Sequence, residues 1–166
     1  MVTTEHKLGE GSWTTYTGPL TVSTEGITNV LSRSTDNAGN VGPVGTLEVR
    51  IDKTAPTITR SIVSGPQFTS GPNIHVTSET TIRINVMDSV SAVSSCTISV
   101  TRSDGVSNIA CGAGDNDFSL TGQNGSRIVT VMATDNAGNS VTFSENYIVG
   151  NSTPSSSTTM TRGGPR

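Results

Sequence analysis

Apolar and polar residues alternate along most of the chain, as they do in strands that turn one face toward a core. In the clearest run, residues 80–88, Ile82, Ile84 and Val86 are separated by single polar residues. Successive side chains of a strand point to opposite faces, so this spacing predicts a half-buried strand. The same pattern predicts further strands at residues 3–8, 12–16, 19–23, 28–35, 44–51, 57–63, 73–76, 95–101, 107–111, 117–120, 126–134 and 140–148.

Composition agrees with an all-β chain. Val, Ile and Thr make up 55 of the 166 residues, and these β-branched side chains favour strands over helices. Thr and Ser together supply 50 residues, whereas aromatic residues are only 4 % of the chain. The net charge of −3 is small, and the apolar residues are clustered rather than dispersed. We therefore expect folded β modules with thin cores rather than a disordered chain.

A repeated hexapeptide is the strongest internal signal. The sequence Thr-Asp-Asn-Ala-Gly-Asn occurs at residues 35–40 and again at 134–139, an offset of 99 residues that suggests tandem modules. Asp accepts hydrogen bonds from backbone N–H groups, Asn tolerates left-handed conformations, and Gly adopts positive φ without steric cost. The motif therefore predicts two structural turns, formed by Asp36, Asn37, Gly39 and Asn40, and by Asp135, Asn136, Gly138 and Asn139.

The strands and the repeat together predict three segments. Residues 54–150 carry enough short, regularly spaced strands for a complete β-sandwich. Residues 1–53 match only the later part of that module, so we expect a partial sandwich that lacks its opening strands and leaves an edge and a face open. Residues 151–166 form a Ser/Thr/Pro-rich tail that cannot build a core. The proline of Asp-Lys-Thr-Ala-Pro, residues 52–56, predicts a short, stiff connection between the modules.

The two cysteines, Cys96 and Cys111, flank two alternating runs joined by a Ser-Asp-Gly turn signal. Pairing them would place Ile98 opposite Ile109 in a hairpin with a sensible register. We therefore predict a cross-strand disulfide and an oxidising compartment, with two reduced thiols as the alternative. The spacing of the two cysteines does not suggest a zinc site.

Residues 12–41 contain a motif series that closely resembles the bacterial Ig-like repeats of cell-surface and secreted proteins. The series is Trp-x-x-Tyr-x-Gly-Pro, starting at Trp13, followed by the Asp-Asn-Ala-Gly-Asn turn that starts at Asp36; the linker Asp-x-Thr-Ala-Pro follows at residues 52–56. The resemblance implies tandem Ig-like β-sandwiches that serve as extracellular spacers, adhesin stalks or accessory domains beside glycoside hydrolases, usually without catalysis. The lack of opening strands and the cysteine pair depart from the usual pattern of the family.

Candidate chemistry in the sequence is sparse. His6 and His75 have no catalytic motif nearby, so we do not expect an enzyme. Calcium needs six to eight oxygen ligands, and Asp36, Asp52 and Asp135 offer isolated carboxylates. We favour turn capping for these residues and predict no cofactor or metal, with calcium as the alternative. Trp13 and Tyr16 are candidates for contact with a sugar ring, although packing is the more common role of a single Trp.

Three functional hypotheses follow, all for an extracellular, surface-attached or secreted protein. The first is a non-catalytic structural or adhesive module whose partners are neighbouring Ig-like modules, a cell-surface glycan or a protein. The second is a filament subunit that joins identical subunits by β-strand complementation, and the third is a carbohydrate-binding accessory domain. The pI near 5.2 and the absence of a basic cluster argue against nucleic acid, and no apolar run approaches the length of a membrane span.

Overall fold

The computed structural model describes residues 2–150. Within this range the chain is all-β, and it divides into two compact units after Thr54. The tail predicted at residues 151–166 lies outside the described residues. No helix in the described part of the chain has the length and apolar character needed to cross a membrane.

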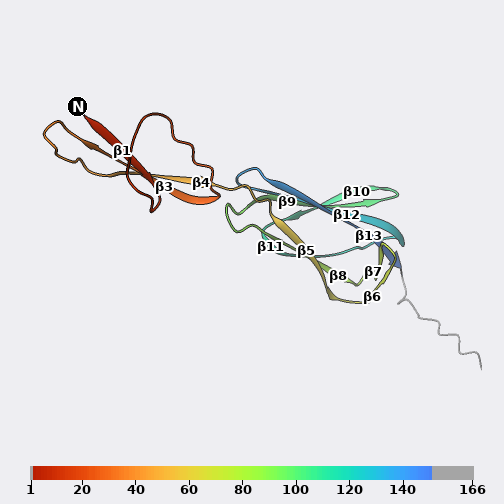
Figure 1. Ribbon diagram of the computed structural model, residues 1–166. Coiled ribbons are helices and arrows are strands. Elements are labelled where there is room, and N and C mark those ends of the chain that lie inside the picture. Colours follow the sequence, from red (N-terminus) through yellow and green to blue (C-terminus); the bar gives the residue numbers. More distant parts are fainter. Residues whose placement is uncertain (1, 151–166) are drawn as a thin grey trace, which may run out of the picture. The chain divides into compact units, whose positions relative to one another are not determined.

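The first unit contains one antiparallel sheet of four strands, drawn in red to orange in Figure 1. The order of the strands across the sheet is β2-β1-β3-β4. Their bounds are β1 Thr3–Leu8, β2 Thr14–Thr15, β3 Gly26–Thr35 and β4 Gly45–Ile51. Strand β4 is therefore an edge strand whose outer side has no partner within residues 2–54.

The strand predicted at residues 19–23 is wrong, because this segment makes no strand pairing. Pro19 has no N–H group to donate to a ladder. Two contacts also hold the following residues in a loop: Lys53 Nζ donates to the carbonyl oxygen of Ser23 at 2.6 Å, and Thr54 Oγ1 donates to Glu25 Oε1. The long connection between β2 and β3 is therefore a loop.

The second unit is a sandwich of two sheets, which form the two layers seen in Figure 1. One sheet has six strands in the order β10-β9-β12-β13-β7-β6, and the other has three in the order β11-β8-β5. All neighbouring strands are antiparallel except β13 and β7, which are parallel. The bounds are β5 Thr57–Ser64, β6 Gln67–Ser70, β7 Asn73–Thr77, β8 Thr81–Met87, β9 Val93–Arg102, β10 Gly105–Cys111, β11 Gly114–Ser119, β12 Gly125–Asp135 and β13 Ser140–Gly150.

The core of the second unit lies between the two sheets. The alternation predicted for residues 80–88 is confirmed: Ile82, Ile84 and Val86 are fully buried, and the residues between them are partly exposed. Strands β9, β12 and β13 bury their side chains from the opposite layer in the same alternating manner. Apolar burial of this kind is the main favourable term in folding, so the sandwich is stabilised chiefly by its inner faces.

The sheet of the first unit corresponds strand by strand to part of the larger sheet of the second unit. Strands β2, β1, β3 and β4 stand in the same order as β10, β9, β12 and β13. The registers also agree, because Val30 lies opposite Leu8 just as Val129 lies opposite Val100. The repeated hexapeptide is thus one part of a larger structural repeat that covers the whole sheet of the first unit.

The two corresponding sheets differ in what covers them. Val100 and Val129 belong to the buried core of the second unit, beneath the three-stranded sheet. Their counterparts Leu8 and Val30 lie on a face that no second sheet covers within residues 2–54. No residue in this range is buried, and Leu47, which shares the face with Val30, is 63 % exposed.

Candidate functional site

Both copies of the repeated turn are capped by their aspartate in the same way. Asp36 Oδ1 accepts hydrogen bonds from the N–H groups of Ala38 and Asn40, each at 2.9 Å, and its Oδ2 accepts one from Asn40 Nδ2. The second copy repeats this pattern on Asp135, with distances of 2.8 to 2.9 Å. Gly39 and Gly138 adopt positive φ angles of 88° and 94°, as the geometry of the turn requires.

The hydrogen bonds hold both aspartates in the ionised form. The side chain and backbone of Asn40 lower the pKa of Asp36 from its ordinary value. Burial acts in the opposite direction on Asp135, which is 2 % exposed. Hydrogen bonds from the Asn139 side chain and the turn backbone outweigh that burial, so the pKa of Asp135 is also lowered.

The second turn is also attached to a neighbouring loop of the same unit. Asn136 donates from its backbone N–H to the carbonyl oxygen of Ala92 at 3.1 Å, and from Nδ2 to that of Ser91 at 2.7 Å. Asp88 caps this loop by accepting from three backbone N–H groups at 2.8 to 3.1 Å. These contacts support Ala92 at φ 67°, an uncommon value for a residue other than glycine.

The third aspartate considered for calcium, Asp52, also caps a backbone group, because its Oδ1 accepts from the N–H of Thr54 at 2.9 Å. Asp36, Asp52 and Asp135 therefore each have at least one oxygen engaged by the backbone of their own segment. This is the turn-capping role favoured from the sequence.

The predicted disulfide is present between Cys96 on β9 and Cys111 on β10, with their Cα atoms 5.1 Å apart. The register is the predicted one, with Ile98 opposite Ile109 and the two cysteines opposite each other. Both cysteines are partly buried and pack against the core of the second unit. The bridge therefore joins the edge strand β10 covalently to β9, which contributes to the core.

Trp13 and Tyr16 do not form a joint platform in the first unit. The guanidinium of Arg33 lies 4.2 Å from the centre of the Trp13 ring, on the face that carries the Arg33–Glu5 ion pair. Tyr16 instead makes an edge-to-face contact with His6, with ring centres 6.0 Å apart. His6 and Arg33 belong to opposite faces of the sheet, because side chains alternate along paired strands.

The two histidines make different contacts, one polar and one with an aromatic ring. His6 Nε2 lies 3.3 Å from Thr14 Oγ1 on the neighbouring strand, and His75 stacks on Phe68 with ring centres 4.4 Å apart. Neither of these two contacts involves a carboxylate.

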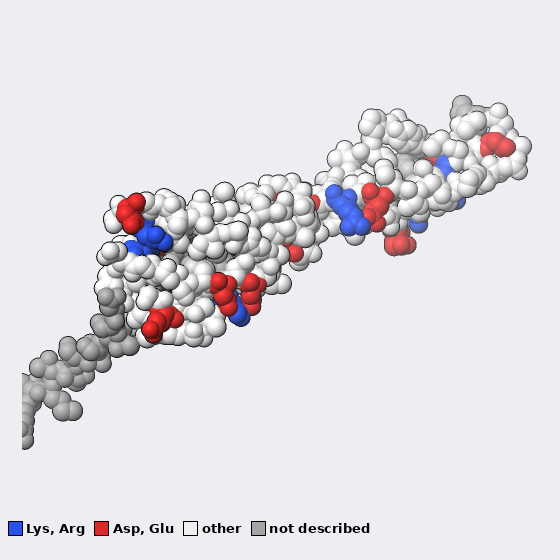
Figure 2. All heavy atoms as spheres, turned by 180° about the vertical axis from the view of Figure 1, so that it is seen from behind, with Lys and Arg blue, Asp and Glu red and all other residues white. Residues whose placement is uncertain are grey.

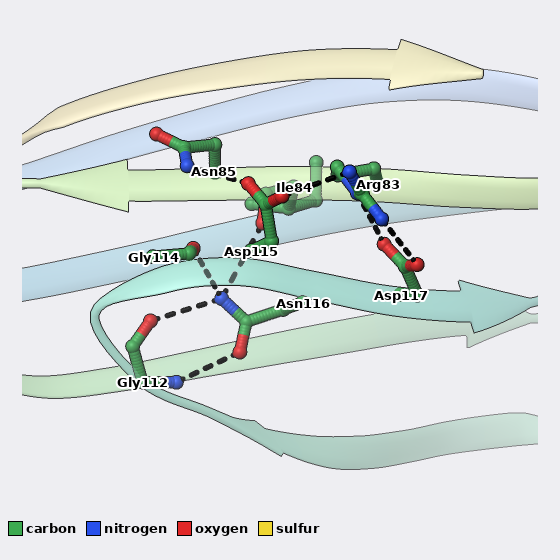
Figure 3. Close-up of polar contacts among 8 residues, drawn as sticks. All are labelled: Arg83, Ile84, Asn85, Gly112, Gly114, Asp115, Asn116 and Asp117. Carbon is green, nitrogen blue, oxygen red and sulfur yellow. Dashed lines mark hydrogen bonds and ion pairs between the residues drawn. The ribbon is translucent and has the colours of Figure 1, made fainter. Parts of the chain in front are cut away.

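A polar network that was not predicted covers part of the outer face of the three-stranded sheet (Figure 3). Arg83 on β8 binds both carboxylate oxygens of Asp117 on β11, at 2.7 and 2.8 Å, and contacts Asp115 at 2.8 Å. This hydrogen bonding lowers the pKa of Asp117 and raises that of Arg83. Asn116 caps the entry to β11 through bonds to Gly112 and Gly114. The ion pairs of Arg83 join two neighbouring strands across the outer face, whereas Asn116, which lies opposite the buried Ile84, belongs to the other face of β11.

Acidic and basic side chains occur in small mixed groups on the face shown in Figure 2. Four of the six arginines in residues 2–150 have a carboxylate partner. The remaining two, Arg102 and Arg127, lie in the second unit, where both line one pocket.

The comparisons with known proteins identify no family for this chain. No protein-family model and no curated protein matches the chain. Among solved structures, the chain is similar to the fibronectin(III)-like modules of CbhA from Clostridium thermocellum, with a TM-score of 0.34 and 14 % identity over 90 % of this chain and 78 % of that chain. The layers and registers of the second unit define the class: it is a β-sandwich of the Ig-like and fibronectin(III)-like kind.

Proposed function

We propose that the chain is a non-catalytic structural or adhesive part of an extracellular prokaryotic protein, built from Ig-like repeats of the bacterial surface type. The repeated sheet carries this proposal: both units share one strand order, one register and one Asp-capped turn. Repetition of one sheet supplies length and surface, which suits a spacer or adhesive module. The disulfide supports an oxidising location, because such bonds persist mainly outside the cytosol.

Single-molecule stretching tests the structural role. We expect the second unit to unfold in one force peak, and reduction of the disulfide to lengthen the released chain. The bridge spans 15 residues, which corresponds to an increase of about 50 Å in extended length. Unfolding without a resolved peak would argue against a mechanical role.

Protease treatment of intact cells tests the location separately. We expect antibodies against residues 55–150 to lose their signal when external protease is added to unbroken cells of the source organism. A cytosolic marker in the same sample serves as the control. A signal that survives until the cells are lysed would contradict an extracellular location.

The open face of the first unit supports a second candidate function, a filament subunit assembled by strand complementation. In the second unit, β7 pairs in parallel with β13 and the three-stranded sheet covers the face. Strand β4, the counterpart of β13, has no neighbour in the position of β7 within the described residues. We propose that a strand from a second copy of the chain occupies this position, because edge addition draws affinity from main-chain hydrogen bonds. A head-to-tail contact of this kind continues into a filament.

Two matched variants test strand complementation. Leu47→Asp places a charge on the open apolar face, whereas Ile27→Asp places it on the opposite face of the same sheet, where Ile27 is 60 % exposed. We expect concentration-dependent assembly in sedimentation velocity for the unmodified chain and for Ile27→Asp, but not for Leu47→Asp. A monomeric unmodified chain at every concentration would exclude this candidate and leave the first proposal intact.

A further inference from the structure

A pocket of about 310 Å³ lies at the end of the larger sheet of the second unit, where β9 ends and β12 begins. Its lining includes Thr101 and Arg102 at the end of β9, Ser103 directly after that strand, and Ser126 and Arg127 from the start of β12. Two arginines and several hydroxyl groups thus border one cavity, and no carboxylate residue contributes to the lining.

The two arginines lie on the same face of neighbouring strands. Ile128 and Thr101 form the last pair of the β9–β12 ladder, and Val129 and Val100, one step inward, are both buried in the core. One step outward from the last pair, Arg127 and Arg102 therefore follow the inward-facing direction of the valines. Directly opposed positions in an antiparallel pair place Cβ atoms about 5 Å apart, and like charges in such positions are destabilising.

Nothing in the described part of the chain neutralises this pair. Arg127 is 4 % exposed and donates only to the backbone carbonyl oxygens of Ser126 and Gln123. Arg102 donates to the hydroxyl of Ser107 at 3.1 Å. The Nε–H groups of both arginines are buried without an acceptor. A buried charge without a counter-charge costs free energy, so an anion bound between the two arginines would stabilise this arrangement.

The first unit provides an internal comparison. The positions that correspond to Arg102 and Arg127 are occupied by Glu10 and Thr28, two residues beyond Leu8 and two residues before Val30. The same sheet therefore forms without a basic pair at this place. The arginines are a specific property of the second unit and are not a requirement of the repeat.

We propose that this pocket binds a small oxyanion, that is, a sulfate, phosphate or carboxylate group held between the guanidinium groups of Arg102 and Arg127. Planar guanidinium groups bind such oxygens in pairs, and the charge-assisted bonds are stronger than neutral ones. The hydroxyl groups of Ser103 and Ser126 lie in the same lining and supply further donors. The group can come from a free inorganic anion or from an acidic sugar, and the site is independent of the proposed structural function.

Isothermal titration with the whole chain tests the site. The ligands are sodium sulfate, sodium phosphate and glucuronate, with sodium chloride at matched ionic strength and uncharged glucose as controls. We expect binding of at least one oxyanion and a loss of tenfold or more in affinity in Arg102→Gln. Arg83→Gln removes an equal charge from the outer face of the same unit and should leave the affinity unchanged. Glucuronate bound more tightly than the inorganic anions would indicate an acidic sugar as the source.

A second test follows the arginine Nε–H groups by NMR. It uses the unmodified chain and therefore does not require any variant to fold. We expect the Arg102 and Arg127 signals of the unmodified chain to shift when the bound anion is added, while those of Arg83 stay in place. Equal weak binding by chloride, or equal shifts of all arginine signals, would overturn the proposal. So would an Arg102→Gln variant that is folded and binds with unchanged affinity.

Discussion

At the scale of single residues, the two aspartates of the repeated hexapeptide cap their turns in the same way in two different environments. Asp36 is exposed and Asp135 is buried, yet each accepts the same three hydrogen bonds. The sequence was sufficient to predict this, because the cap is formed within one hexapeptide. Burial could not be predicted from the motif, since it depends on strands that are distant in sequence.

Acidification should destabilise the second unit through Asp135. Its pKa is lowered in the folded state, so its stabilising effect is complete above the unfolded value of about 3.9 and is lost as the pH falls through the folded pKa. We expect the melting temperature to drop below pH 4. The Asp135→Asn variant should melt at a lower temperature at pH 7 and show a weaker acid dependence. An unchanged acid dependence in this variant would refute the assignment.

Removing the hydroxyl of Tyr147 should also destabilise the second unit. Tyr147 is fully buried, and its hydroxyl donates to Glu145 Oε2 at 2.7 Å, beside the Arg60–Glu145 ion pair. We expect Tyr147→Phe to lower the free energy of unfolding by about 1.5–3 kcal/mol, as for other hydrogen bonds to a charged acceptor. Urea denaturation measures this. A Tyr16→Phe variant, altered at an exposed ring, serves as the control and should show no change.

At the scale of elements, alternation and turn signals predicted most of the strands. They missed β6, because Gln67–Ser70 contains a single apolar residue and forms a short edge strand. They also failed at residues 19–23, where proline and long-range contacts decide the conformation. The arginine pair escaped notice because Arg102 and Arg127 are 25 positions apart in sequence. The pair could have been predicted by continuing the inward-facing alternation two residues beyond Val100 and two residues before Val129, which leads to Arg102 and Arg127.

The disulfide hairpin should contribute a measurable part of the stability. A bridge that closes a loop of 15 residues is expected to be worth about 3 kcal/mol, because it restricts the unfolded chain. We expect the Cys96→Ala/Cys111→Ala double variant to unfold at correspondingly lower urea concentration. Adding a reductant should bring the unmodified chain close to that value and leave the variant unaffected. Equal unfolding midpoints with and without the bridge would contradict this.

At the scale of the molecule, the two units differ in how much they bury. All the core residues belong to the second unit, whereas residues 2–54 contain no buried residue. The sequence predicted an incomplete first module through its missing counterpart strands. It could not show which face would be open, since that follows from the register of β1, β3 and β4.

Hydrogen exchange on the intact chain should detect this difference. We expect amides of β3 to exchange orders of magnitude faster than those of its counterpart β12, because exchange protection follows local opening energy and core burial. Both strands have an antiparallel neighbour on each side and end at copies of the same turn, so β12 is the matched reference. Equal protection of β3 and β12 in the monomer would mean that the first unit is stable without a covering layer.

The parallel pairing of β7 with β13 has a consequence for how the second unit bears tension. Tension applied through residues 55 and 150 first reaches β5, which is antiparallel to β8 and can separate from it. It next acts along the five parallel pairs from Asn146–Asn73 to Gly150–Thr77. These strands are pulled at opposite ends, so their hydrogen bonds are loaded together in shear rather than broken one after another. This short ladder should therefore set the rupture force, while the disulfide on β9 and β10 sets only how much chain is released afterwards.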